Sequence, residues 1–453
     1  MKLKLFKTVG LLIALSFSTT IFSQAKQDVK QKISPDLLRN DFLFLRDTLQ
    51  KIHPGIYRYI SKATFNQITD SCYDSIRDSM TTTDFFTLTS FVIASIGDGH
   101  TNCKLSSDAT KEIISTTKFF PAMVVFIHNK AFIYCCRQDS TLNASELLSI
   151  NNQPTDKIVQ KLFNYIPSDA FIQSHKNWEL NDNFPLLYNA LYGETNNYKI
   201  TCKTRKGEIK TAVLQADAIK NFICPSPFSR PDKYLKLTYT SNNVAVLSIK
   251  TFFDGYLNQT GENFKAFLDS AFTDIRNKKI TKLIIDIRGN QGGNDGNGEL
   301  LYSYLTSKPF RYYLSQETVT TKFSSNNHPN LALQQPQKNN YSGKVFVLID
   351  GRSFSASAEF SSIVKTNDRG KFIGEECGGG YYGNTSGDED LVTLPATKIT
   401  VRIPRVKYSM AVNSIGNNIY SIQPDFSVYQ TIADFINRDD NQLNYAIKLV
   451  GNI

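Results

Sequence analysis

One stretch of the sequence, residues 345–360, combines a candidate nucleophile with the strand and helix that would position it. Residues 345–349 form an unbroken apolar run typical of a buried strand, and Asp350-Gly351 interrupts it. Small residues before Phe360 favour the start of a helix. Ser355 would then lie at a helix N-terminus, where unpaired backbone N–H groups suit an oxyanion. The pattern predicts a serine nucleophile.

Ser355 and Ser357 are alternative nucleophiles. On a helix of 3.6 residues per turn, Ser357 is turned by roughly 200° from Ser355. Glu359 follows Ser355 by four residues and falls on the same helical face, where its carboxylate could lie beneath the serine. This spacing favours Ser355. The non-catalytic alternative is that Ser353 or Ser355 is a structural N-cap of the helix.

His100 offers a proton acceptor for such a serine. Glycines on both sides of Asp98 predict a tight loop that presents His100 rather than burying it. Imidazole titrates near neutral pH, which suits a general base, although a structural role is the alternative. His53 is the weaker rival, because the Pro54-Gly55 turn already explains its segment.

A glycine-rich turn follows the apolar residues 282–287. Its sequence, Arg288-Gly289-Asn290-Gln291-Gly292-Gly293, exposes backbone N–H groups that can hold an anion or a developing oxyanion. Phosphate binding is a rival interpretation, but neither GxGxxG nor GxxxxGK[ST] is present. A plain turn is the remaining alternative.

Strand-like and helix-like segments alternate around these motifs, which predicts an α/β catalytic domain over residues 230–453 with a largely parallel core sheet. Strands are expected at 243–249 and 282–287, with an amphipathic helix at 264–275 between them. Residues 391–394 and 399–403 predict a hairpin or edge strands. The glycine-rich loop at 374–383 would line a cleft.

Two further domains are expected ahead of it. Helical spacing from residue 34 to 96 predicts a helical domain over residues 34–107. Residues 108–220 carry short β-rich runs around a helical piece at 155–165, which predicts a compact β-rich domain. Residues 147–154 resemble the strand and turn of a PDZ-like module, and a plain packing domain fits the pattern equally well.

The chain has 453 residues, a length that favours two or three domains. Residues 1–24 begin with lysines, continue with an apolar stretch and end in a polar exit, which predicts a secretory signal peptide. No later run reaches the roughly 18 apolar residues of a membrane helix. The first cysteine, Cys72, lies too far along for a lipid anchor. We therefore expect export to a periplasmic or extracellular space without a stable membrane anchor.

Composition argues against several other classes. The seven cysteines show no CxxC spacing and the five histidines show no HExxH pair, so no metal site and no cofactor are expected. The net charge of +10 is spread over lysine-rich loops without a basic block, so nucleic acid is not an expected partner. Neither charge nor composition specifies an oligomeric state.

Taken in order, five motifs resemble those of the tail-specific (C-terminal-processing) serine proteases and their tricorn-core relatives. The motifs occupy residues 98–101, 286–293, 353–359, 374–375 and 423–425. The resemblance covers nearly the whole mature chain and implies a crotonase-like catalytic core. It also implies that Ser355 is the nucleophile, with the amides of Gly292 or Gly293 and of Ala356 forming the oxyanion hole.

The sequence departs from this family at two points. Members with a serine and lysine pair place the lysine after Gly374-Glu375, where this chain has Gly380. Their acid follows the serine by three residues, whereas Glu359 follows Ser355 by four, which keeps Ser357 open. Tricorn-like members take their base from a histidine ahead of the core.

His100 fits the position of that histidine. An acceptor is then needed to orient its imidazole, and three residues are candidates for that role. They are Glu359, Glu376 and Asp98.

The resulting hypothesis is an exported serine peptidase, either an endopeptidase or a carboxy-terminal processing enzyme, that acts on unfolded tails or short peptides. One rival is a catalytically inactive peptide- or ligand-binding protein on the same fold, because a fold can be kept while its chemistry differs. A second rival is an enzyme that handles acyl-CoA, against which the export signal counts.

Overall fold

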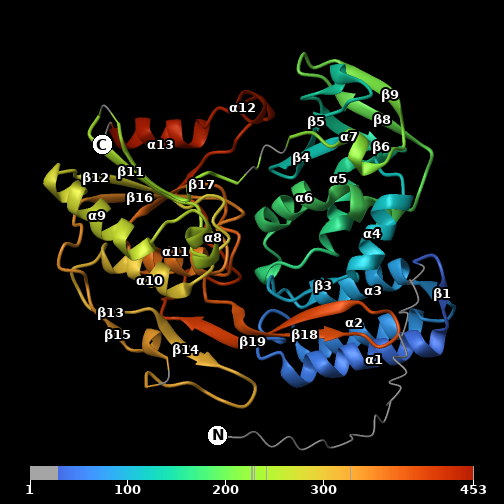
Figure 1. The fold of residues 1–453 in the computed structure, drawn as a ribbon, viewed down its shortest axis with the longest axis horizontal. Helices are drawn as coiled ribbons and strands as arrows, with labels where there is room; N and C mark the ends of the chain where they lie inside the picture. The colour runs from blue at the N-terminus through green and yellow to red at the C-terminus, as the bar shows by residue number, and fades with distance from the viewer. Residues whose placement is uncertain (1–28, 226–227, 229, 241, 327, 452–453) are drawn as a thin grey trace, which may run out of the picture.

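The computed structural model describes residues 29–451 except 226–227, 229, 241 and 327. The predicted signal peptide lies outside these residues. Figure 1 shows an α/β body at the C-terminal end of the chain, a helical body near the N-terminus and a third body between them in sequence. No helix in the described part of the chain has both the length and the apolar character needed to cross a bilayer.

A six-stranded sheet forms the centre of the C-terminal body. Its order is β10 (Leu235–Tyr239), β11 (Val244–Ile249), β12 (Lys282–Asp286), β16 (Lys344–Ile349), β17 (Lys371–Gly374) and β20 (Phe426–Ser427). All neighbours run parallel except β10 and β11. The predicted α/β class is confirmed, whereas the crotonase-like type of the core stays a prediction.

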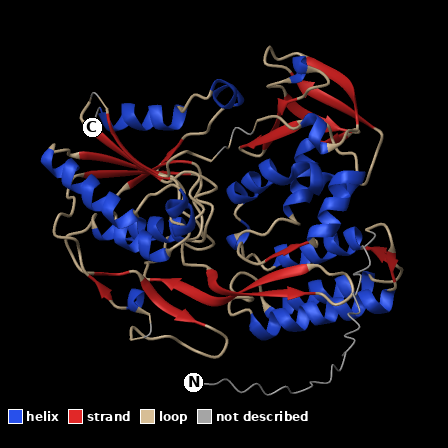
Figure 2. Ribbon diagram, viewed as in Figure 1, coloured by secondary structure: helices blue, strands red, loops and turns tan. Residues whose placement is uncertain are grey.

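Helices cover both faces of this sheet (Figure 2), as expected for a parallel sheet that buries both faces. Leu247 and Ile285 belong to the core on one face, whereas Val246 and Ile284 belong to the other. The first core is shared with α9 (Phe264–Asn277), α10 (Asp295–Ser303) and α11 (Ala356–Thr366), and the second with α13 (Asn441–Gly451). Alternation of side chains along each strand therefore builds two cores.

The carboxyl ends of four of the parallel strands, β11, β12, β16 and β17, meet at one edge of the sheet. Four loops leave from that edge, at residues 250–253, 287–294, 350–355 and 375–384. Functional groups of open α/β sheets gather at such edges. Two of these loops carry the glycine-rich turn and Ser355.

The N-terminal body is helical, in line with the sequence pattern. It contains α1 (Pro35–Ile52), α2 (Lys62–Ser75) and α3 (Thr82–Ser95), with the short strands β1 (Lys32–Ile33), β2 (Met80–Thr81) and β3 (Asn102–Lys104). A hairpin from the other end of the chain, β18 (Thr385–Thr393) and β19 (Thr400–Met410), completes its core. Leu394 and Val401 of the hairpin segment are fully buried with Leu38 and Phe42.

The middle body is more helical than the sequence suggested. Its sheet has the order β4 (Met123–Ile127), β5 (Lys130–Cys135), β6 (Glu146–Ile150), β8 (Asn197–Lys203) and β9 (Ile209–Gln215), with β7 (Gln153–Pro154) beside β6. The helices are α4 (Ser107–Thr116), α5 (Thr155–Phe163), α6 (Gln173–Tyr192) and α7 (Ile219–Phe222). The 20-residue helix α6 buries the polar residues His175, Lys176 and Asn177, which hides its helical period in the sequence. The PDZ likeness stays a prediction.

The remaining helices and strands are short. They are α8 (Asp254–Gln259), β13 (Phe310–Arg311), β14 (Tyr313–Glu317), β15 (Leu333–Gln334) and α12 (Ile432–Asn437). A disulfide between Cys135 of β5 and Cys224 ties the middle sheet to the segment that leads into the C-terminal body. The other five cysteines are free.

Candidate active site

Ser355 and His100 meet at the sheet edge although 255 residues separate them. The distance between His100 Nε2 and Ser355 Oγ is 3.1 Å, which is a hydrogen bond. Ser355 stands at the N-terminus of α11 with φ 54° and ψ −128°, a backbone conformation that a serine adopts only under strain. Its side chain makes no capping hydrogen bond. The helix-cap alternative therefore does not describe Ser355.

The two neighbouring serines have different surroundings. Ser353 Oγ donates to the carbonyl of Ile287 at 3.0 Å and accepts from the amide of Asp350 at 3.1 Å, so it ties two loops together. Ser357 is fully buried, and its hydroxyl has no hydrogen-bond partner among the described residues. Of the three serines, Ser355 is the one within reach of a histidine.

His100 is held by the loop that the sequence singled out. Asp98 Oδ1 accepts from the amides of His100 and Thr101, both at 2.9 Å, and from Thr101 Oγ1 at 3.1 Å. Behind this loop, Gly55 donates its amide to His53 Nδ1, which leaves the proton on Nε2, 2.8 Å from Thr101 Oγ1. His53, the weaker rival for the base, thus supports the loop of His100.

The expectation that the loop exposes His100 is wrong, because its side chain is only 7 % exposed. The ring of Phe354 stacks on it with centroids 4.6 Å apart, and His175 stacks on the opposite face of Phe354 at 4.5 Å. Burial lowers the pKa of His100 to about 4, although the charge of Asp98 opposes the shift. A neutral imidazole can accept a proton from a serine.

The glycine-rich turn lies against the serine. A β-carbon on Gly292 would lie 2.7 Å from Ser355 Cβ and 2.8 Å from the amide nitrogen of Ala356. The Gly292 amide, however, donates to Asn290 Oδ1 at 2.9 Å. Among the described residues, no hydrogen bond engages the amides of Gly293 and Ala356. The candidate oxyanion donors therefore reduce to Gly293 and Ala356.

The carboxylate of Glu359 has hydrogen-bond partners other than Ser355 and His100. It accepts from Tyr313 Oη and from Asn384 Nδ2, both at 2.6 Å. Burial, with a contribution from Asp295, raises the pKa of Glu359 to about 7. Tyr313 and Asn384 hold this carboxylate, and among the described residues it forms no hydrogen bond with Ser355 or His100.

The two other candidate orienting acids are also engaged elsewhere. Glu376 accepts from Ser421 and Gln423, and Asp98 binds the backbone of its own loop. Among the described residues, His100 Nδ1 has no hydrogen-bond partner although it is buried. The three predicted acids therefore leave this nitrogen unpaired.

Asp169, which lies in the same cluster, was not predicted from the sequence pattern. Single ligand atoms of Asp98, His100 and Asp169 lie within 4.8 Å of one another. Within the part of the chain that the structure describes, these three residues are the set that could hold a metal ion, but backbone N–H groups of Gly99, His100, Thr101 and Gly380 already point at the two carboxylates. N–H dipoles of this orientation stabilise the anions without a cation.

Gly380 occupies the position where the lysine of serine and lysine members would be. Its amide donates to Asp169 at 3.1 Å. A β-carbon at Gly380 would lie 2.8 Å from the carbonyl oxygen of Gly383 and 2.8 Å from Tyr59 Oη. The loop therefore has no room for a longer side chain at residue 380. The carboxylate of Asp169 accepts the hydrogen bond of the Gly380 amide.

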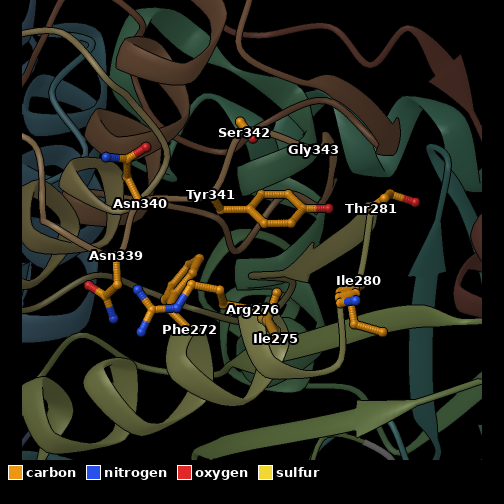
Figure 3. Close-up of a pocket in the computed structure, with 11 residues that line it drawn as sticks. Phe272, Ile275, Arg276, Ile280, Thr281, Asn339, Asn340, Tyr341, Ser342 and Gly343 are labelled. Carbon is orange, nitrogen blue, oxygen red and sulfur yellow. The ribbon is translucent and has the colours of Figure 1, made fainter.

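Two cavities flank the sheet. One of about 720 Å³ borders the glycine-rich turn at Gly289 and Gln291, with Trp178 and Arg352 in its wall. A smaller one of about 270 Å³ lies between the end of α9 and residues 339–343, next to Tyr341 (Figure 3). Because β12 and β16 begin beside the smaller cavity, it lies at the opposite edge of the sheet from Ser355.

The family model of peptidase family S41 matches residues 243–444, the segment that contains the sheet, the glycine-rich turn and Ser355. This part of the chain is similar to the S41 peptidases. The predicted resemblance to the tail-specific and tricorn-core proteases is thereby confirmed, and the match supports a peptidase. No curated protein sequence matches the chain.

Solved structures agree with the S41-like domain in fold. Mature CPAF is 14 % identical, with 92 % of this chain and 97 % of that chain covered and a TM-score of 0.63. A putative peptidase from Parabacteroides merdae is 16 % identical, with the same coverages and a TM-score of 0.50. At such identities the likeness establishes the fold, and it extends over the N-terminal and middle bodies as well.

Proposed function

We propose that this protein is an exported serine peptidase that hydrolyses peptide bonds in unfolded protein tails or short peptides. Ser355 Oγ attacks the peptide carbonyl, and His100 Nε2 takes the serine proton. The observation that carries the proposal is the 3.1 Å contact between these two atoms, which brings a strained serine and a neutral buried imidazole together.

The remaining steps use groups at the same sheet edge. The amides of Gly293 and Ala356 stabilise the oxyanion of the tetrahedral intermediate. His100 then passes the proton to the leaving amine, which leaves an acyl-enzyme on Ser355. Water, activated by His100, hydrolyses this ester and releases the second peptide.

The purified mature protein should react with a fluorophosphonate probe. Ser355→Ala and His100→Ala should abolish labelling, whereas Ser357→Ala should retain it. Loss with Ser357→Ala alone would move the nucleophile by two residues. Absence of labelling in the unmutated protein would favour the binding-protein interpretation.

Cleavage of a peptide library followed by mass spectrometry separates the two types of peptidase. Internal cuts in peptides with both ends blocked are expected for an endopeptidase. Cuts that require a free carboxyl terminus are expected for a carboxy-terminal processing enzyme.

Export rests on residues 1–24 and is tested by cell fractionation. When the full sequence is expressed, the protein should be recovered outside the inner membrane, and residues 1–24 should have been cleaved off. A chain without residues 1–24 should remain in the cytoplasm. Recovery of the full-length precursor in the cytoplasm alone would contradict export.

A further inference from the structure

Asp169 is placed by a strained turn between the middle body and the loop of His100. Ala170 and Phe171, which follow it, have φ values of 47° and 65°, and neither is a glycine. Two consecutive non-glycine residues in this region cost free energy that the surrounding contacts must offset. One such contact is the hydrogen bond from the Ala170 amide to the carbonyl of Gly97 at 2.9 Å. The turn is therefore fixed against the loop that carries His100.

The carboxylate of Asp169 is 1 % exposed and lies between the two loops of the site. One oxygen accepts from the Gly99 amide at 2.8 Å and the other from the Gly380 amide at 3.1 Å. No lysine or arginine of the described residues forms a hydrogen bond or ion pair with it. A carboxylate has about four acceptor sites, so two backbone bonds leave capacity for a further donor.

His100 offers the matching donor. Its Nε2 faces Ser355, and its buried Nδ1 has no partner among the described residues. A buried polar atom without a partner costs about 1–3 kcal/mol. One ring nitrogen of His100 lies within 4.8 Å of a carboxylate oxygen of Asp169, and a small side-chain rotation or one bridging water spans a distance of this size.

Asp98, the other acid of the cluster, is a weaker partner for Nδ1. Its Oδ1 already accepts three hydrogen bonds from its own loop, and its Oδ2 lies 3.5 Å from His53 Nε2. The Nε2–H of His53 therefore faces the second oxygen of Asp98, whereas no side-chain N–H of the described residues forms a hydrogen bond with Asp169. Asp169 is the acid with free acceptor capacity.

We propose that Asp169 is the positioning residue that accepts Nδ1–H of His100 and so keeps Nε2 free to take the proton of Ser355. The inference rests on the proposed function and supplies the acceptor that Glu359, Glu376 and Asp98 do not provide. No covalent step is added, because the proton on Nδ1 stays on the imidazole throughout.

The protonation state of Asp169 sets the direction of this hydrogen bond. Burial, with a contribution from Asp98, raises the pKa of Asp169 to about 7. A protonated Asp169 donates to Nδ1 and forces the imidazole proton onto Nε2, where it blocks proton transfer from Ser355. The charged and titratable groups that face Asp169 are Asp98, His100, Arg58, Tyr59, Glu359 and Cys377.

The test is the pH profile of kcat/KM for peptide hydrolysis by the unmutated protein and by Asp169→Asn. We expect kcat to fall on the order of 10²–10⁴-fold in the variant, with KM little changed and with the rise of activity near pH 7 lost. Asp41→Asn is the matched control, since Asp41 is equally buried and also accepts backbone amides, those of Ala396 and Thr397. Equal kcat and equal pH profiles in the two variants would overturn the proposal.

Nitrogen NMR of histidine-labelled protein gives a readout that does not depend on hydrolysis. The signal of His100, assigned with His100→Gln, should show the proton on Nδ1 at pH 8 and should change tautomer in Asp169→Asn. If the tautomer changes but no peptide is cleaved, the proposed function fails while the orienting role stands. If peptides are cleaved through Ser355 and the tautomer stays the same, the orienting role is wrong.

Discussion

Gly293 and Phe253 are so close that a β-carbon on Gly293 would lie 2.3 Å from the backbone nitrogen of Phe253. Gly293 also has φ 134°, which L side chains rarely adopt, so a larger residue must move the turn. Gly293→Ala should therefore displace an oxyanion donor and lower kcat on the order of 10²–10³-fold. Steady-state kinetics on a peptide substrate measures this.

Gly289→Ala is the matched control for that change. Gly289 lies in the same turn with φ 75°, but no atom lies within 4 Å of its missing β-carbon. It carries the backbone strain without the collision. A similar kcat in both variants would show that strain alone, and not the displaced amide, lowers the rate.

Ser353 and Ser357 should respond in opposite ways to alanine. Ser353→Ala leaves the Ile287 carbonyl and the Asp350 amide without their partner, and should lower the free energy of unfolding by about 1–3 kcal/mol. Ser357→Ala removes a buried hydroxyl without a partner and should leave the free energy of unfolding unchanged or higher. Urea unfolding compares the two. A larger loss in Ser357→Ala would mean that its hydroxyl is paired.

Glu359 should make the protein less stable as the pH rises. Its pKa is about 7 in the folded protein against an ordinary value of 4.5, so its contribution is fully present below pH 4.5 and is lost by about pH 7. The loss amounts to roughly 3 kcal/mol for a shift of this size. The free energy of unfolding is measured with urea at pH 5 and at pH 8. From pH 5 to pH 8, the free energy of unfolding of Glu359→Gln should rise relative to that of the unmutated protein.

The exposed Glu208→Gln serves as the control for that experiment. The difference in unfolding free energy between Glu208→Gln and the unmutated protein measures the effect of replacing an exposed glutamate by glutamine. A difference for Glu359→Gln that stays constant from pH 5 to pH 8 would contradict the raised pKa.

The disulfide between Cys135 and Cys224 should stabilise the middle body. It closes a loop across 89 residues, so its removal should lower the free energy of unfolding by about 2–4 kcal/mol. Reductant should lower the melting temperature of the unmutated protein but not that of Cys135→Ala. Cys136→Ala, which changes the free neighbour, should remain sensitive to reductant.

Local signals in the sequence were enough for much of the S41-like domain. The apolar runs at β12 and β16, and the small residues at the start of α11, each reside within about ten residues, so no distant contact is needed to find them. The position of Ser355 at the end of a strand follows from the same signals. The hairpin β18–β19 was also visible, but its packing under the N-terminal helices was not, because that contact joins opposite ends of the chain.

The surroundings of His100 could not be predicted in the same way. Its burial depends on Phe354 and His175, which come from two other bodies of the fold. Asp169 lies in a turn where Ala170 and Phe171 take up positive φ, and neither residue type signals that conformation. Its partners are backbone amides 70 and 211 residues away, and contacts between backbone groups at such separations produce no recognisable sequence pattern.

The pairing of β3 with β19 sets a condition that the proposed activity must wait for. β3 begins two residues after His100, and Asn102 and Cys103 pair with Arg402 and Val401. A chain still being synthesised, or one cut before residue 400, has Ser355 but lacks the strand that anchors the histidine loop. Under the proposed function, such a chain is silent toward peptide bonds, and activity arises only after residues 400–402 have paired with β3.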